Sequence, residues 1–390
     1  MISPIRTVLT VLLFFTINVS LAPASQISLP GPAGNIGLNI STDQQYIRYS
    51  LDYDSQTIIS PSALGGLKLK DAGILGNDME VMNITFENHN QTRKPALTAE
   101  KTIHHKFNRC TLNLREKAEP HRKLTIDFRV YDNGIAFRYR MPAQPGMEKI
   151  TITEEGNEIV FPADYNCFAA QADSAGKYKS SKISNINAKN LIALPVLIEA
   201  ENCWLTIAQA RLHGYSAMNL TGNGPKLKLN TTLDNKDVNI QTSLPHTGPW
   251  RVIIIARNPK NFRETALLKN LSRQNQITNT SWIRPGRILR ANWHHLEFPN
   301  GPLKQADNSK PAHRILSGIS AMKYHIDFAH KNNYSHLLID AESYLSRQID
   351  QPGPWQPDFL SRLASLDALA NIRQIIRHAA GKDVGIFLSV

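Results

Sequence analysis

The sequence predicts a multidomain fold of β plus α/β class, in which an antiparallel β-sandwich is followed by an incomplete TIM-type (β/α) barrel. Three observations support this prediction. The chain has 390 residues, and a single hydrophobic core stops growing well below that size. From about residue 26 to residue 285, short segments of alternating apolar and polar residues are separated by Gly, Asn, Asp and Pro. After residue 286 the apolar period lengthens to that of helices, which alternate with short apolar segments.

The first 24 residues have the pattern of a secretory signal peptide. A single cation, Arg6, precedes an apolar stretch over residues 8–17, and residues 22–24 (APA) match a small-x-small cleavage site. A membrane anchor is the alternative, but this stretch is shorter than the roughly 20 residues that a membrane span needs. We therefore expect cleavage after Ala24, export to the periplasm or cell envelope, and no transmembrane span in the mature protein.

Charge and cysteine content argue against several classes of protein. The formal net charge is +12, yet Lys and Arg are interspersed with acidic residues, which is typical of a solvated surface rather than of a nucleic-acid-binding protein. The three cysteines, Cys110, Cys167 and Cys203, are too few and too widely spaced for a disulfide scaffold or a zinc site. They allow at most one disulfide bridge. The sequence leaves their pairing and the oligomeric state open.

The clearest β element is a hairpin in the first domain. Apolar and polar residues alternate over residues 124–130 and 135–141, and Asp132-Asn133-Gly134 supplies the turn between them. This pattern predicts a ribbon with one buried face. Further strands are expected at residues 46–53, 103–114, 150–153, 194–199, 204–208 and 250–256. So many strands with little helix between them favour a large sandwich over a small barrel.

The second domain is predicted to start at residue 286, so that residues 25–285 form the sandwich and residues 286–390 the barrel portion. A short helix over residues 258–270 and a connector over residues 281–286 precede it. Strands are expected at residues 287–293, 335–340 and 384–390, with helices at 312–332 and 366–379 between them. This β-α-β-α-β order requires a parallel sheet with right-handed crossovers. Because three strands do not close a barrel, we expect the chain to be a truncated part of a longer one.

Several motifs, in order along the chain, resemble glycoside hydrolase family 97. They are residues 60–65 (SPSALG), 128–139 (FRVYDNGIAFRY), 250–256 (WRVIIIA), 280–286 (TSWIRPG) and 324–329 (YHIDFA), followed by the strand that ends at Asp340. This is a family of exported bacterial α-glucosidases and α-galactosidases. The resemblance implies an N-terminal β super-sandwich, a catalytic (β/α)8 barrel and an α-linked oligosaccharide as substrate.

The resemblance also implies a calcium site, to which a glutamate of the sandwich contributes in a Glu-Ala-x-Leu-x-x-Tyr pattern. In this sequence the matching segment is residues 209–215 (QARLHGY), so that Gln209 stands at the glutamate position. A neutral amide still offers one oxygen to a hard cation, but it lacks the charge that supplies most of the affinity. Gln209 is therefore the candidate metal ligand, and the substitution weakens the case for calcium.

Candidate sugar-binding residues follow the first two predicted barrel strands. Asp340 and Glu342 stand where the family has Asp-Glu-Gly-Trp, and the carboxyl ends of barrel strands form the active-site face. Trp293 and Tyr344 are expected to line the same site, with Trp293 stacking on a sugar ring. The alternatives are structural: Asp340 braces the next loop, Glu342 is a solvated loop residue and Trp293 fills the core.

Glycoside hydrolysis needs two carboxyl groups, one as acid and one as base or nucleophile. The resemblance places both on later barrel strands that this chain does not contain, so we assign no catalytic residue. We expect the chain to be the N-terminal portion of an exo-acting α-glycoside hydrolase, inactive by itself. The alternatives are a non-catalytic sugar-binding or degenerate family member, and a β-sandwich used for protein adhesion.

Overall fold

The computed structural model describes residues 26–42, 45–93, 102–172, 177–233, 240–273, 276–283, 286–290, 319–340 and 366–389. The chain divides into two compact units, Met1–Gln276 and Ile277–Val390. The boundary expected at residue 286 lies a short way into the second unit. Within the described ranges, no helix is both long and apolar enough to cross a membrane.

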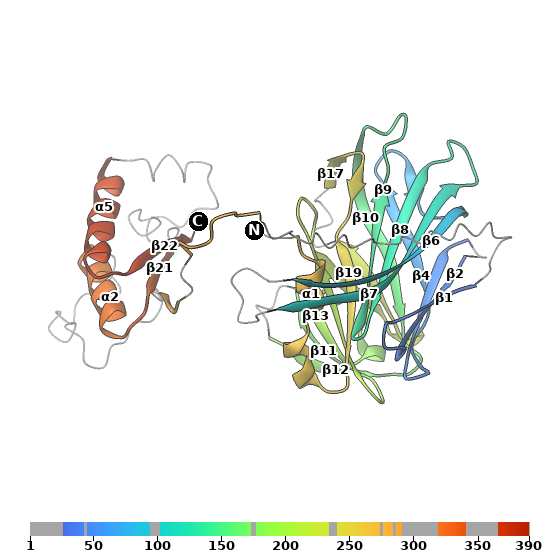
Figure 1. Ribbon diagram of the computed structural model, residues 1–390, viewed down its shortest axis with the longest axis horizontal. Coiled ribbons are helices and arrows are strands. Elements are labelled where there is room, and N and C mark those ends of the chain that lie inside the picture. The colour runs from blue at the N-terminus through green and yellow to red at the C-terminus, as the bar shows by residue number, and fades with distance from the viewer. Residues whose placement is uncertain are drawn as a thin grey trace, which may run out of the picture. The chain divides into compact units, whose positions relative to one another are not determined.

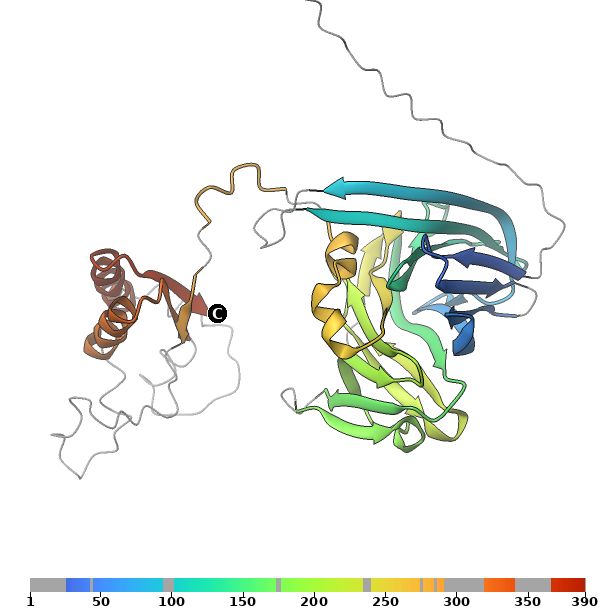
Figure 2. The same ribbon diagram turned by 60° about the horizontal axis from the view of Figure 1, so that its bottom comes forward.

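The first unit consists of two antiparallel ladders of strands (Figures 1 and 2). The first ladder contains β1 (Gln26–Pro30), β2 (Ile36–Ser41), β3 (Ile47–Tyr53), β4 (Gln56–Leu69), β5 (Gly73–Leu75), β10 (Lys149–Val160) and β17 (Ile240–Ser243). The second ladder contains β6 (Met79–Arg93), β7 (Ile103–Glu116), β8 (Lys123–Tyr131), β9 (Gly134–Met141), β19 (Trp250–Ala256), β14 (Trp204–Ala210), β13 (Ile192–Glu199), β11 (Asn166–Gln171) and β12 (Lys179–Lys182). Strands β15 (Met218–Asn223), β16 (Lys228–Leu233) and β18 (His246–Thr247) extend it, and β10 joins the two ladders by also pairing with β16. The large antiparallel β domain is therefore confirmed.

Both ladders contribute to one hydrophobic core. Tyr49 on β3 packs against Phe137 on β9, with the ring centroids 5.8 Å apart, and both side chains are buried. Because side chains alternate along a strand, every second residue of β3 and of β8 enters this core. Full burial of an aliphatic or aromatic side chain contributes roughly 1.5–3 kcal/mol, so this cluster supplies most of the driving force for folding of the unit. Cys110, Cys167 and Cys203 are buried in it as free thiols.

The predicted hairpin is confirmed as β8 and β9, joined at Gly134. Gly134 has φ +150°, and a Cβ there would lie 2.4 Å from the carbonyl oxygen of Ile253, so the turn requires glycine. The sequence predicted one buried face for this hairpin, but residues on both of its faces are buried. The outward-facing Asp127 and Ala136 are also fully buried, because a layer of aromatic and arginine side chains covers this part of the ladder.

The helix expected over residues 258–270 is divided in two. Asn258 caps the first turn by accepting a hydrogen bond from the backbone N–H of Lys260, and the 3₁₀ helix η3 (Pro259–Glu264) follows. Thr265 then adopts an extended conformation before α1 (Leu267–Leu271) begins. The break allows Leu267 and Leu271 to bury themselves against the outer face of the second ladder, beside Trp250.

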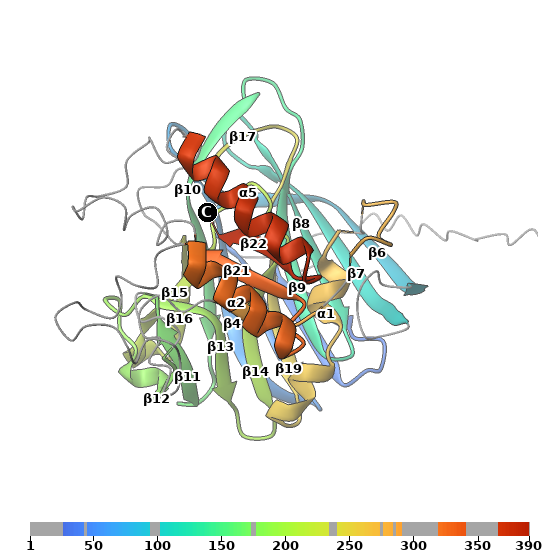
Figure 3. The same ribbon diagram turned by 90° about the vertical axis from the view of Figure 1, so that its left-hand side faces the viewer.

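The second unit contains a parallel sheet of β20 (Ile288–Arg290), β21 (His336–Asp340) and β22 (Gly385–Ser389). Figure 3 shows the helices α2 (Ile319–Lys331) and α5 (Leu366–Ala380) lying alongside this sheet. One core joins the helices and the sheet, made of Ile326, Ala329, Leu337, Ile339, Ile375, Ala379 and Val384. The expected β-α-β-α-β order with parallel strands is confirmed in the described segments.

Candidate functional site

The predicted sugar-binding residues lie at or beyond the edge of what the structure describes. Asp340 is the last residue of β21 and is in register with Ser389 of β22, so its backbone lies at the carboxyl end of the parallel sheet, as predicted. Its side chain, and all of Trp293, Glu342 and Tyr344, lie outside the described residues. Their role in sugar binding stays a prediction. Gln209 is the one candidate whose side chain the structure describes.

Gln209 lies near the end of β14 and is paired with Arg251 of the neighbouring strand β19. Its side-chain oxygen Oε1 accepts two hydrogen bonds, one from the backbone N–H of Met218 and one from Nη1 of Arg251, both at 2.9 Å. An amide oxygen has two lone pairs, so these two donors satisfy its accepting capacity. Gln209 is therefore held in place by a backbone donor and a cation.

Arg251 forms a buried ion pair with Glu155 of β10. Nε and Nη2 of Arg251 each donate to one carboxylate oxygen of Glu155 at 2.6 Å, and both side chains are only 3% exposed. Such a bidentate pair fixes the guanidinium plane as well as its position. Burial lowers the pKa of Arg251, but the charge and hydrogen bonds of Glu155 outweigh this effect, and the net direction is upward. Arg251 therefore stays charged.

The remaining lone pairs of Glu155 are satisfied by neutral donors. The Tyr215 hydroxyl donates to Oε2 at 3.1 Å, and Asn157 Nδ2 donates to Oε1 at 2.9 Å. The Tyr139 hydroxyl in turn donates to Asn157 Oδ1 at 2.6 Å. Burial, followed by the charge of Glu155, raises the pKa of both tyrosines well above the ordinary value, so each remains a donor. The result is a hydrogen-bonded polar network inside the apolar core.

This network does not fit a calcium ion at Gln209. Calcium requires six to eight oxygen ligands, usually several of them carboxylates. Here the single amide oxygen already faces the Arg251 guanidinium, which repels a cation. In the described part of the chain, no cluster of three or more His, Cys, Asp or Glu side chains has the arrangement of a metal site.

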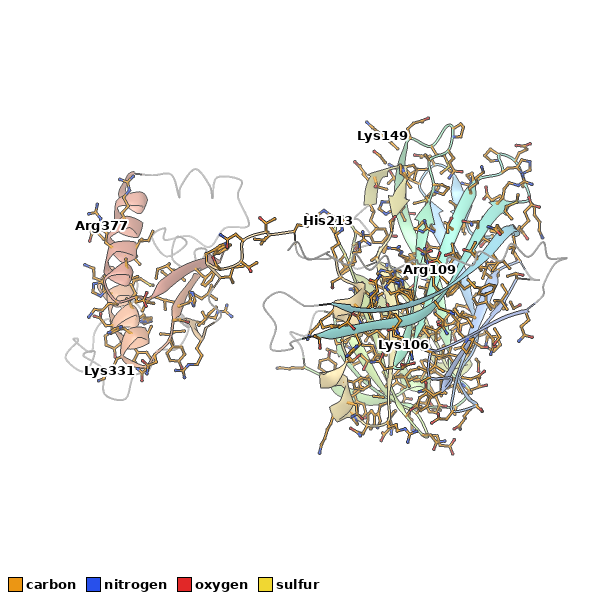
Figure 4. All side chains as sticks on the ribbon, viewed as in Figure 1. Lys106, Arg109, Lys149, His213, Lys331 and Arg377 are labelled. Carbon is orange, nitrogen blue, oxygen red and sulfur yellow. The ribbon has the colours of Figure 1, made fainter. Side chains whose placement is uncertain are left out.

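A second polar cluster lies on the outer face of the second ladder, around Asp127. This carboxylate is fully buried and accepts hydrogen bonds from Arg109 Nη2 at 2.8 Å, Arg138 Nε at 3.0 Å and Arg140 Nη2 at 3.0 Å, with Thr111 as a further donor. Burial alone would raise the pKa of Asp127. The hydrogen bond and charge of Arg109, with the charges of Arg140 and Arg138, outweigh burial and lower the pKa to about 2. We call these four charged residues the arginine cluster; Figure 4 labels Arg109.

The Trp250 ring packs against guanidinium groups at the arginine cluster. The guanidinium of Arg138 lies 4.2 Å from the Trp250 ring centroid, and that of Arg129 lies 4.5 Å from the centroids of both Trp250 and Phe107. Local sequence patterns did not predict that these arginines gather beside Trp250. The signal was present in the hairpin, where charged residues occupy alternate positions that pair across the strands, such as Asp127 opposite Arg138.

The buried ion pair predicts a large effect of Glu155→Gln on stability. Removing one partner leaves the Arg251 charge buried without compensation, which costs about 3–5 kcal/mol in free energy of unfolding. The measurement is urea denaturation of the mature chain. Glu154→Gln is the matched control, because Glu154 is 66% exposed and pairs with Lys68 at the surface, so its stability should equal that of the wild type. Equal stability of the two variants would contradict the proposed role of the pair.

The low pKa of Asp127 predicts a specific acid dependence. Its folded pKa lies below the ordinary value of 3.8, so its stabilising contribution is present above that value and is lost as pH falls toward 2. The contribution amounts to about 2 kcal/mol. Asp127→Asn should be less stable at neutral pH and should show a shallower loss of stability over this interval. Thermal unfolding across a pH series measures both effects, and an unchanged slope in the variant would refute the assignment.

Comparison with known proteins identifies the family. The model of the glycosyl-hydrolase 97 N-terminal domain matches residues 29–273. The chain belongs to glycoside hydrolase family 97. A retaining α-galactosidase from Bacteroides thetaiotaomicron is 19% identical over 408 residues, which cover 95% of this chain and 56% of that protein. A probable retaining α-galactosidase from Streptomyces bingchenggensis is 24% identical over 261 residues, covering 66% of this chain and 36% of that protein.

Solved structures of similar proteins support the same fold. A family 97 enzyme from Pseudoalteromonas sp. strain K8 in complex with acarbose has a TM-score of 0.71 at 19% identity, covering 92% of this chain and 53% of that one. A β-arabinopyranosidase has a TM-score of 0.72 at 19% identity, covering 93% and 55%. The resemblance drawn from the sequence motifs is confirmed. The family 97 chain described here spans about half the length of these relatives.

Proposed function

We propose that this chain is the N-terminal portion of an exo-acting α-glycoside hydrolase of α-galactosidase or α-glucosidase type, which hydrolyses α-linked oligosaccharides. The family match over residues 29–273 carries the proposal. It is supported by the α-galactosidase relatives and by family 97 structures in complex with acarbose and panose. The two-unit organisation agrees with it, because a β domain precedes a parallel β/α unit.

We further propose that the second unit is the first part of a (β/α)8 catalytic barrel. Its core lies between the sheet and the helices α2 and α5, whereas Ile288 and Phe387, on the strands, are each 47% exposed. In a closed barrel such side chains fill the interior. The sugar site would then lie at the carboxyl ends of the strands, where Asp340 ends β21 and where Trp293, Glu342 and Tyr344 follow in sequence. In this proposal Trp293 stacks on the sugar and the other three bind its hydroxyl groups.

One observation favours a second candidate, a non-catalytic family member that binds sugar. Gln209 replaces the glutamate that the family motif carries, and its oxygen is occupied by Arg251 and Met218. A family member that has lost this carboxylate could retain sugar binding without hydrolysis. The two candidates differ in turnover, so an activity measurement separates them.

The native protein tests the hydrolase proposal. An antibody raised against the first unit should capture from the source cells a protein that releases nitrophenol from the nitrophenyl α-galactoside or α-glucoside. The captured protein should begin at Ser25, because we propose that it is exported after cleavage of residues 1–24. Capture in the presence of excess antigen is the control. Absence of turnover on both glycosides would refute hydrolysis, and heat on titration with melibiose or maltose would then support the binding candidate.

The contacts of Gln209 predict that calcium does not stabilise the mature chain. We expect the midpoint of thermal unfolding to differ by less than about 1 °C between millimolar calcium chloride and a chelator, since a ligand stabilises only a state that binds it. Gln209→Glu is the matched variant, because it restores the carboxylate at the same position. If calcium stabilises only this variant, the amide of Gln209 is the reason that the wild type does not respond. Stabilisation of the wild type by calcium would overturn the expectation.

A further inference from the structure

We propose that Arg129 and Arg138, stacked on Trp250 at the outer face of the second ladder, form a binding site for a carboxylate anion. The site is argued from described residues of the first unit alone and does not rest on the proposed function. Three observations carry the proposal: the geometry of the two guanidinium groups, their unsatisfied donors and the shortage of carboxylates around them.

Stacking fixes the orientation of both guanidinium groups. The Cζ atom of Arg129 lies over the rings of Phe107 and Trp250, 4.5 Å from each centroid, and that of Arg138 lies over Trp250 at 4.2 Å. Trp250 is 1% exposed and Phe107 is 4% exposed, so the rings form a rigid support. A stacked guanidinium has its face covered and directs its N–H donors outward in its own plane. Both side chains are thus oriented before any ligand arrives.

Both side chains retain donors without an acceptor. Among the described residues, the side chain of Arg129 makes no hydrogen bond and no ion pair, and its Nε is buried without a partner. Arg138 is 9% exposed and uses Nε to bind Asp127, while its Nη1 is buried without a partner. Each buried donor left unsatisfied costs about 1–3 kcal/mol. The terminal Nη groups of Arg129 also have no acceptor among the described residues, and these are the donors that an anion would reach.

The local charge balance favours an incoming anion. The nearby carboxylates are already bound: Asp127 accepts from Arg109, Arg138 and Arg140, and Glu87 pairs with Arg109 at 3.2 Å. Arg129 is thus a cation for which the described residues supply no carboxylate. Burial lowers the pKa of Arg138 to about 10 despite its pairing with Asp127, and the charges of Arg129 and Arg211 add to this effect. The positive charges destabilise one another, and an anion would relieve the repulsion.

The chemistry of the cluster favours a carboxylate. Asp127 shows how these side chains bind one, because Arg109 and Arg138 donate to its two different oxygens. A planar carboxylate accepts paired N–H donors in the guanidinium plane, and this plane is the part that stacking leaves free. A phosphate also accepts such donors, so it serves as the competing probe.

The test uses the mature chain and sodium acetate as the probe. Acetate should raise the midpoint of thermal unfolding more than sodium chloride or sodium phosphate at the same ionic strength, and titration calorimetry should detect saturable binding. Arg129→Gln should weaken the acetate affinity at least about tenfold, because it removes a charged donor group. Within the described residues the Arg129 side chain makes ring contacts but no hydrogen bond, so this variant should still fold. Arg257→Gln is the matched control, since Arg257 is 76% exposed and pairs with Asp54, and it should leave acetate binding unchanged.

The other outcomes overturn the proposal in distinguishable ways. Equal effects of acetate and chloride would show that no carboxylate site exists. Binding of phosphate without binding of acetate would refute the ligand class. Unchanged acetate binding by Arg129→Gln would place the site elsewhere. None of these results bears on turnover of α-glycosides, so failure of this proposal is separate from failure of the proposed function.

Discussion

The buried ion pair between Glu155 and Arg251 is the interaction on which the polar interior of the first unit depends. Both groups are almost fully removed from water, and the cost of this desolvation is offset only when geometry and hydrogen bonding are nearly complete. Tyr215 and Asn157 meet this requirement for the carboxylate, and Gln209 accepts the further donor of Arg251. Side-chain hydrogen bonds of Arg251 on β19 therefore link this strand to Glu155 on β10 and to Gln209 on β14.

The alternation of side chains along β19 links this network to the outer face. Arg251 points into the core, and its neighbour Trp250 consequently points outward, where it supports Arg129 and Arg138. The position of the outer arginines is thus set by the same strand that carries the inner ion pair. A shift of register by one residue would exchange the two faces and place a tryptophan where the core requires a guanidinium.

The sequence was sufficient for features that depend on local periodicity. The hairpin closed by Gly134, and the order of strands and helices that ends at β22, follow from apolar spacing and turn residues. Contacts between residues far apart in the sequence could not be predicted from local patterns. Glu155 and Arg251 are 96 residues apart, and no local pattern indicates that they pair. The interrupted helix at Thr265 was also missed, because burial of Leu267 against the second ladder overrides the local helical pattern.

The charge balance of the inner network explains why Gln209 matters for the family comparison. Glu155 and Arg251 neutralise each other, so a neutral amide at position 209 leaves the group without net charge. A glutamate at the same position would leave one uncompensated negative charge, and a hard divalent cation binds where such charge is concentrated. An amide in place of a carboxylate at position 209 therefore removes the net negative charge that would attract a cation. In this chain Arg251 Nη1 donates to the amide oxygen of Gln209 and so occupies the position facing it.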